Sequence, residues 1–146
     1  MKGAPLTLCL LDIDDFKLVN DRWGHPVGDH VLAQIATQLR RDGEAFRLGG
    51  DEFALLLPGE DTDSAREVAR TILGRIERHQ LNRGGSVTAS AGLATFPDDG
   101  STGGDLIQLA DTALYWAKDE GKNRVRACRP ADEELETAIA PVAVPA

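Results

Sequence analysis

The sequence predicts an α+β domain in which helices flank a mostly antiparallel central sheet. Three observations support this class. Short apolar runs of strand character alternate with stretches in which apolar residues recur at helical spacing. Two of the strand-like runs are joined by Gly49-Gly50, a pair that favours a tight antiparallel hairpin. The expected order is strand, helix, strand, strand, helix, strand, helix, strand, so hairpin pairing is combined with helical crossovers.

The first half of the chain predicts a central strand, a helix and the hairpin. The continuous apolar run from Leu6 to Leu11 is typical of a strand that is buried on both faces. Residues 17–28 are expected to form a loop, and apolar residues then recur at helical spacing between Val31 and Leu39. Residues 45–48 and 53–57 are the expected arms of the hairpin.

The second half predicts two further helices, two strands and a tail. Ser64 and Glu67 fit a capping box for a helix whose apolar stripe covers residues 65–76. Residues 129–146 are rich in Pro, Ala and Glu without a core-forming pattern, and we expect a disordered tail after a domain that spans residues 1–128. The remaining elements are a strand, a helix and a short last strand, expected over residues 87–93, 105–119 and 124–128.

Composition narrows the classes of function. A chain of 146 residues is long enough for one domain with a substantial core. Its net charge of −8 argues against a nucleic-acid partner or an anionic membrane surface, because both require clustered Lys and Arg. Cys9 and Cys128 form no metal-binding motif, and we see no signal peptide and no membrane-spanning run. We therefore expect reduced thiols and a cytoplasmic protein.

Acidic residues stand at the edges of two predicted strands. Asp51 and Glu52 follow the Gly49-Gly50 turn directly, and Asp12 ends the first apolar run. Glycines without side chains allow a ligand to approach the backbone of the turn closely. Two carboxylate sites of this kind can share hard divalent cations, which points to phosphoryl or nucleotidyl chemistry.

Four ordered segments carry a family resemblance. DIDDFKLVNDRWGHPVGD, followed by RLGGDEF, resembles the GGDEF family of diguanylate cyclases, which condense two GTP into cyclic di-GMP and release two pyrophosphates. TASAGLA and AKDEGKNRV match later segments of the family in the same order, so the resemblance covers about residues 6–125 and is far more specific than one short motif. It implies a palm-like nucleotidyl cyclase fold and a two-fold homodimer in which each protomer binds one GTP.

The resemblance also implies a metal site. Two Mg²⁺ or Mn²⁺ ions per active site would be bound by Asp12, Asp51 and the main-chain carbonyl of Ile13, with Glu52 beside the second ion. Asp51 or Glu52 would help to deprotonate the attacking 3′-hydroxyl. The plainer alternative is that Asp12 and Asp51 only flank turns, where aspartate is common.

Recognition of the base is expected from residues in the predicted loop over residues 17–28 and at the start of the helix that follows it. Asn20 and Asp29 match the family's guanine-binding positions, and a carboxylate can accept hydrogen bonds from the N1–H and N2 amine that adenine does not present. Alternatively, Asp29 is the N-cap of the following helix and Asn20 is a turn residue. His25 is a weaker substrate contact or only orders its loop, and Gly49 and Gly50 are expected to lie against the substrate.

Three lysines are expected to bind phosphate. Lys17 matches the position that stabilises charge at the α-phosphate, and Lys118 and Lys122 match positions that hold the β- and γ-phosphates. The alternative for Lys118 and Lys122 is that they are helix C-terminal cations favoured by the macrodipole. Asp14 and Asp15 are expected to face solvent or to cap the loop, without a chemical role.

The sequence departs from the family pattern in ways that leave alternatives open. The usual opening helix is missing before the first strand, so a stand-alone minimal enzyme and a trimmed piece are both possible. The product-inhibition motif RxxD is incomplete, because Arg40 is followed three places later by Gly43. Arg47 is expected to be a structural ion-pair partner. Alternative functions are a non-catalytic GTP-binding or protein-interaction module, and a half-site that is active only beside another GGDEF protein.

Overall fold

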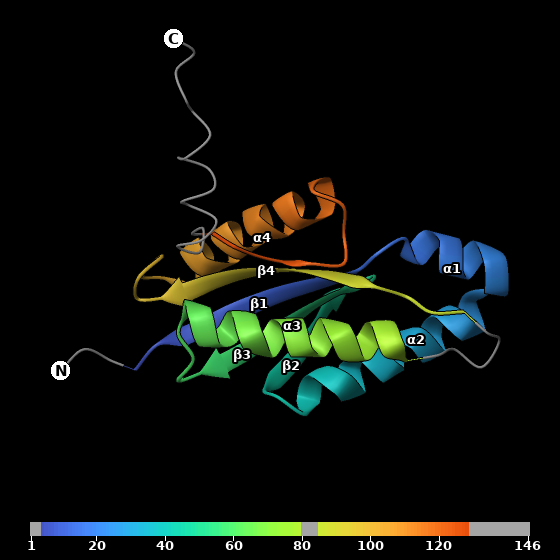
Figure 1. Cartoon of the computed structure of the whole chain (residues 1–146), viewed down its shortest axis with the longest axis horizontal. Coiled ribbons are helices and arrows are strands. Elements are labelled where there is room, and N and C mark those ends of the chain that lie inside the picture. The colour runs from blue at the N-terminus through green and yellow to red at the C-terminus, as the bar shows by residue number, and fades with distance from the viewer. Residues whose placement is uncertain (1–3, 80–84, 129–146) are drawn as a thin grey trace, which may run out of the picture.

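One five-stranded sheet carries the fold, with helices on both of its faces (Figure 1). The computed structural model describes residues 4–79 and 85–128; the predicted tail, residues 129–146, lies outside these ranges. The predicted α+β class is confirmed. The elements in chain order are β1 (Leu6–Ile13), α1 (Phe16–Trp23), α2 (His25–Arg40), β2 (Glu44–Gly49), β3 (Glu52–Pro58), α3 (Thr62–Arg78), β4 (Ala89–Phe96), α4 (Gly103–Asp119) and β5 (Val125–Ala127).

The sheet is mostly antiparallel, as predicted. Its strand order is β2-β3-β1-β4-β5, with β1 paired antiparallel to β3 on one side and to β4 on the other. β2 and β3 form the predicted hairpin, and among the described strands only β4 and β5 pair in parallel. The central place of β1 explains its unbroken apolar run, because a strand covered on both faces has no polar side.

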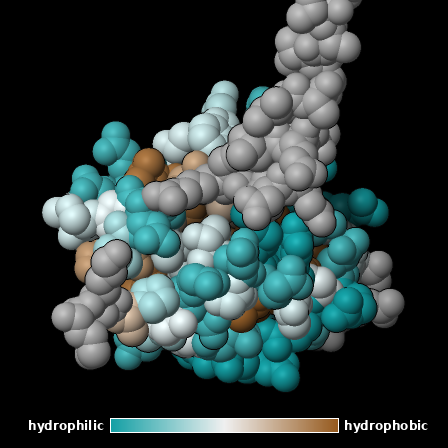
Figure 2. Space-filling view, turned by 60° about the vertical axis from the view of Figure 1, so that its left-hand side comes forward, coloured by the Kyte–Doolittle hydropathy of each residue, from teal (hydrophilic) through white to brown (hydrophobic). Residues whose placement is uncertain are grey.

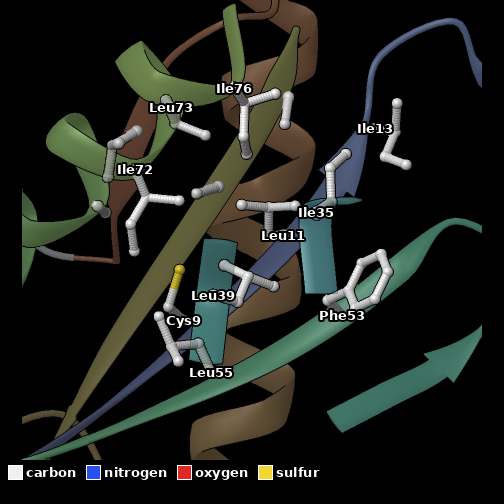
Figure 3. Packing of buried hydrophobic residues seen from close by; sticks show 14 of the residues in the cluster. Cys9, Leu11, Ile13, Ile35, Leu39, Phe53, Leu55, Ile72, Leu73 and Ile76 are labelled. Atoms are coloured by element: carbon white, nitrogen blue, oxygen red, sulfur yellow. The ribbon is translucent and has the colours of Figure 1, made fainter. Parts of the chain in front are cut away.

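Alternate residues of β1 point into two separate cores. Cys9, Leu11 and Ile13 belong to the larger cluster, which α2 and α3 cover; Figure 3 shows these three side chains near those of both helices and of Phe53 from β3. Leu8 and Leu10 lie on the other face of the sheet, in a smaller cluster with α4. This alternation fixes the register of β1 and therefore the position of Asp12 at its end.

The predicted loop over residues 17–28 is wrong, because the structure contains α1 and the first turn of α2 there. Phe16, Val19 and Trp23 recur at helical spacing and pack against the larger core. Polar residues between them hide this periodicity in the sequence. Gly24, with φ of 89°, separates the two helices.

The start of α3 also differs from the prediction. Its N-cap is Asp61, whose carboxylate accepts a hydrogen bond from the Ser64 backbone N–H at 2.9 Å, so the Ser64–Glu67 capping box is wrong. Aspartate is as good an N-cap as serine, and here it stands one turn earlier. The strands predicted over residues 87–93 and 124–128 exist as β4 and β5 with shifted bounds.

The surface is predominantly hydrophilic in the view of Figure 2, with apolar residues in small areas. Within the described ranges, no helix combines the length and the hydropathy needed to cross a bilayer. The large apolar side chains that are exposed come from α1, β2 and α4: Leu18, Phe46, Leu48, Ile107, Tyr115 and Trp116.

Candidate functional site

The two acidic segments singled out in the sequence lie side by side in the structure. Asp12 is the antiparallel partner of Glu52, and the Ile13 backbone N–H donates to the Asp51 carbonyl at 3.2 Å. The turn between β2 and β3 depends on Gly49 and Gly50, whose φ angles of 145° and 54° suit glycine. Antiparallel pairing of β1 with β3 is therefore what brings the end of one strand to the start of the other.

The exposed Arg47 side chain, on the β2 arm of the hairpin, binds the backbone of the glycine turn. Its Nε and Nη2 atoms donate to the Gly50 carbonyl at 3.0 and 2.7 Å. The ion pair predicted for Arg47 is therefore replaced by a backbone contact, because the turn brings a carbonyl within reach of the guanidinium. This contact fixes the backbone immediately before Asp51.

Asp12 carries the most perturbed carboxyl group of the site. Burial, followed by the hydrogen bond with the Asp51 carboxyl, raises the pKa of Asp12 to about 7, although the Lys118 ammonium group opposes the shift. Lys118 Nζ forms an ion pair with Asp12 Oδ1 at 3.3 Å, and within the described ranges this buried oxygen accepts no hydrogen bond. Burial also raises the pKa of Glu52, with further increases from the charges of Asp111 and Asp51. Negative charge is crowded here.

These carboxylates fit a divalent-cation site that has few protein ligands. Two neighbouring carboxylates with an unsatisfied buried oxygen can be stabilised by a cation that both contact. No group of three His, Cys, Asp or Glu side chains gathers into a complete metal cage in the described part of the chain. Mg²⁺ does not need such a cage, because water and substrate phosphate supply its remaining ligands. Asp12, Asp51 and the Ile13 carbonyl remain the predicted protein ligands.

We expect the metal-free protein to lose stability as the pH rises from about 4 to about 7. The folded Asp12 carboxyl keeps its proton up to about pH 7, whereas the unfolded chain releases it near the ordinary value of 3.8. The folded state therefore binds more protons in this window, and its free energy of unfolding falls as the pH rises. Melting temperatures in EDTA at pH 5 and pH 8 check this, compared with Asp12→Asn, in which the difference should shrink. Adding Mg²⁺ at pH 8 should raise the melting temperature of the wild type only. An equal pH dependence in both proteins would contradict the assignment.

Asp14 is buried. The prediction that this residue faces solvent or caps the loop is therefore wrong. Its carboxylate accepts hydrogen bonds from Thr88 Oγ1 at 2.7 Å, Ser90 Oγ at 2.7 Å and the Asn123 backbone N–H at 2.9 Å. The side chain is 2% exposed. Asp14 thus joins the end of β1 to the segment before β4, to β4 itself and to the turn after α4. Its only sequence signal is that it lies two residues after Asp12.

The structure brings two of the three predicted lysines to the acidic residues. Lys118 at the end of α4 lies 3.3 Å from Asp12 and 3.6 Å from Asp14, and Lys122 Nζ lies 2.6 Å from Asp15 Oδ1. The hydrogen bond with Asp15 raises the pKa of Lys122. Lys17 is exposed near the start of α1. These lysines are not merely helix-terminal cations, because two of them contact carboxylates of distant segments.

Asp15 and Asn123 shape the connections on either side of these contacts. Asp15 occupies the N-cap position of α1 with a φ of 54°, makes no side-chain cap bond and is half exposed, which agrees with the expected solvent-facing residue. Lys122 and Asn123 have φ angles of 65° and 48°. A left-handed pair of non-glycine residues is unfavourable by itself, and the Asn123–Asp14 hydrogen bond compensates for part of this strain.

The residues predicted for base recognition lie on α1 and α2. Asn20 is on α1, and its buried Oδ1 atom has no hydrogen-bond partner in the part of the chain that the structure describes. Asp29 is the fifth residue of α2, so the proposed N-cap role is wrong; the helix begins earlier, at His25. Asp29 lines a cavity of about 390 Å³ between α2 and the hairpin, together with Leu32, Ala33, Ala36, Arg40, Ala45, Phe46, Arg47 and Phe53. His25 is exposed and is not among the residues that line this cavity.

Known sequences are similar to this chain over most of its length. The family model described as "Diguanylate cyclase, GGDEF domain" matches residues 1–124. Over 119 residues the chain is 40% identical to the bifunctional diguanylate cyclase/cyclic di-GMP phosphodiesterase MucR of Pseudomonas aeruginosa, covering 77% of this chain and 17% of that protein. It is 37% identical over 131 residues to the probable diguanylate cyclase DgcT of Escherichia coli, covering 84% of this chain and 29% of that protein. The chain therefore spans less than a third of the length of these relatives.

Solved structures of the same architecture are also similar. The active GGEEF domain of a diguanylate cyclase from Vibrio cholerae matches with a TM-score of 0.82 and 31% identity, over 88% of this chain and 85% of that chain. The GGDEF domain of DgcB from Caulobacter crescentus, in complex with c-di-GMP, matches with a TM-score of 0.79 and 35% identity, over 85% of this chain and 78% of that chain. The fold expected from the resemblance is confirmed.

Proposed function

The chain belongs to the GGDEF domain family, and we propose that it is a diguanylate cyclase that condenses two GTP into cyclic di-GMP and releases two pyrophosphates. The observation that carries the proposal is the convergence of Asp12, Asp51 and Lys118, from β1, the hairpin turn and α4. Carboxylates beside a lysine are what a metal-bound triphosphate requires. The names of the relatives support synthesis of cyclic di-GMP.

The carboxylates would provide both metal binding and proton transfer. Asp12, Asp51 and the Ile13 carbonyl, with Glu52 alongside, would hold two Mg²⁺ or Mn²⁺ ions, which neutralise phosphate charge and polarise the reacting phosphoryl group. Asp51 or Glu52 would accept the proton of the 3′-hydroxyl. The raised pKa of Glu52 supports this role, because a more basic carboxylate is a better proton acceptor near neutral pH.

The lysines would bind the triphosphate. Lys118 contacts Asp12 of the site and Lys122 contacts Asp15 just beyond the end of β1, and phosphate oxygens would replace or share those contacts. Lys17 would stabilise charge that develops at the α-phosphate, and its exposed place on α1 leaves it accessible. Gly49 and Gly50 leave open space beside the turn for the substrate.

Asp29→Ala should weaken selection of GTP over ATP about 10- to 100-fold without lowering the melting temperature. The exposed carboxylate would accept from the guanine N1–H and N2 amine, and such charged hydrogen bonds contribute about 1.5–3 kcal/mol. Because Asp29 lies within α2 and caps nothing, alanine should be tolerated there. Competition of ATP with GTP for binding measures the effect. If the variant rejects ATP as strongly as the wild type does, Asp29 does not recognise the base.

We further propose that catalysis needs a two-fold homodimer. Each protomer would hold one set of metal and nucleotide residues, whereas the reaction joins two GTP molecules, so two sites would have to face each other. The alternatives are a non-catalytic GTP-binding or protein-interaction module and a half-site that needs another GGDEF protein. Because the acidic residues and lysines of the family motif are all present, we prefer the catalytic homodimer to these two alternatives.

Incubation of the purified protein with GTP and Mg²⁺, followed by chromatography of the nucleotides, tests the proposal. We expect one cyclic di-GMP for every two pyrophosphates, at a specific rate that rises with protein concentration until the dimer is saturated. GTP binding without product would support the non-catalytic module. Product that forms only after addition of a second GGDEF protein would support the half-site.

Cyclic di-GMP should not inhibit this protein through Arg40. A side chain at Gly43 would place its Cβ 2.3 Å from the Leu56 carbonyl oxygen, so a carboxylate cannot occupy that position without moving the backbone. Asp42 contacts Arg75 of α3 instead. Without a carboxylate at position 43, the N1–H and N2 donors of a bound guanine would stay unpaired, and each buried unpaired donor would cost about 1–3 kcal/mol of binding free energy. Calorimetric titration should show no tight binding, and initial rates should not fall as product is added. Submicromolar binding that disappears in Arg40→Ala would show that another residue supplies the carboxylate.

A further inference from the structure

Gly28 lies on α2 at a point where side chains of α1 pack closely against its backbone. It is a buried residue, the fourth of α2, at the end of the first helical turn. A Cβ atom built at this position would lie 1.8 Å from Asn20 Oδ1, 3.0 Å from Asn20 Cγ and 3.2 Å from Phe16 Cζ. The Asn20 carboxamide therefore occupies the volume that the side chain of any other residue at position 28 would fill.

The helix itself gains nothing from this glycine. Glycine is among the least favourable residues in a helix interior, and alanine is the most favourable. Gly28 has no positive φ that would require glycine. Its observed effect is to leave space for Asn20.

Packing, rather than hydrogen bonding, holds the Asn20 carboxamide. Its Oδ1 atom is buried and has no hydrogen-bond partner among the described residues, although most buried polar atoms in folded proteins have one. Asn20 and Phe16 are four residues apart on α1, so their side chains share the face that packs on α2. The oxygen is closed off against Gly28, whereas the carboxamide nitrogen Nδ2 is not among the buried unpaired atoms, so the nitrogen is the atom left to donate to a ligand.

We propose that Gly28 is a positioning residue for base selection: by lacking a side chain, it leaves room for the Asn20 Oδ1 atom and so keeps the carboxamide nitrogen where it can donate to a guanine acceptor. The inference rests on the proposed function, in which Asn20 contacts the base. With a methyl group at position 28, the Asn20 side chain has to turn away. The fold survives, because the displaced atoms end a short flexible side chain and the Phe16 ring has to move only slightly.

The experiment compares Gly28→Ala, Asn20→Ala and the double variant. Binding is measured by calorimetry with 3′-deoxy-GTP and 3′-deoxy-ATP in Mg²⁺, because neither nucleotide carries the attacking hydroxyl and no turnover interferes. We expect each single variant to bind 3′-deoxy-GTP about tenfold more weakly and 3′-deoxy-ATP unchanged. The double variant should lose no more than Asn20→Ala, because both changes remove the same contact. The melting temperature of Gly28→Ala should not fall.

Gly74→Ala is the matched control. Gly74 lies in the interior of α3, and a Cβ there would meet only the end of the Arg78 side chain, at 3.2 Å from Nη1. It should match Gly28→Ala in melting temperature and the wild type in nucleotide binding.

Several results would overturn the inference. Wild-type binding by Gly28→Ala, with selection lost in Asn20→Ala, would refute the positioning role and leave the base assignment intact. Additive losses in the double variant, or equal losses for both nucleotides with a lower melting temperature, would show a general structural role. Unchanged selection in Asn20→Ala would refute the base assignment and the inference with it. Absence of cyclic di-GMP despite selective binding would count only against the proposed catalysis.

Discussion

Asp51→Asn is expected to lower the rate of cyclic di-GMP formation at least about a hundredfold while the protein stays folded. Loss of a residue that only supports a metal ligand costs 10- to 100-fold, so loss of a ligand itself should cost at least as much. Asp51 is partly exposed at the end of the hairpin turn, and its carboxyl meets that of Asp12. Replacing it by a neutral amide removes a cation-binding charge without emptying any part of the core.

The same variant should gain stability when metal is absent. Because Asp51 raises the pKa of Asp12, its charge repels the ionised Asp12 carboxylate above pH 7. In EDTA at pH 8, Asp51→Asn should therefore melt at a higher temperature than the wild type, and Mg²⁺ should stabilise it less. Asp63→Asn, on the exposed first turn of α3, is the control and should retain turnover. Retained turnover in Asp51→Asn, together with an unchanged melting temperature, would refute the metal assignment.

Asp14→Ala is expected to lower the free energy of unfolding by about 3 kcal/mol. Three donors, on Thr88, Ser90 and Asn123, lose their acceptor, and an unpaired buried donor costs about 1–3 kcal/mol. The total is less than the sum, because the two hydroxyls can rotate towards other acceptors. Activity should fall as well, since the left-handed turn at Lys122 loses the hydrogen bond that anchors it.

Chemical denaturation measures this change, with Asp14→Asn as the conservative variant. The amide keeps the shape and one acceptor oxygen, so its loss of stability should be intermediate. Ser90→Ala should cost less in the Asp14→Ala background than in the wild type, because the hydrogen bond is already missing. A change below about 0.5 kcal/mol in Asp14→Ala, as at an ordinary surface position, would show that the hydrogen-bond network does not support the fold.

Local sequence patterns were sufficient to predict an element where one residue type dominates its segment. The run from Leu6 to Leu11 predicted a central strand, and β1 is the middle strand of the sheet. The Gly49-Gly50 pair predicted the hairpin, since few other residues adopt the positive φ angles of this turn. α1 was missed because the side chains that pack on the larger core are few, the buried Val19 and the partly buried Phe16 and Trp23, and the surface that they contact comes from other elements.

The order of motifs determined the family, and with it the predicted acidic residues and lysines. The sequence alone could predict these residues because neighbouring residues specify a hairpin turn and the end of a strand. The tertiary structure alone showed that Asp14 is buried, that Asp29 lies within α2 and that Gly28 leaves space for Asn20. Each of these facts depends on segments far apart in the sequence or on where a neighbouring helix begins. Burial and hydrogen bonding are properties of the surroundings of a side chain, and only the folded chain supplies those surroundings.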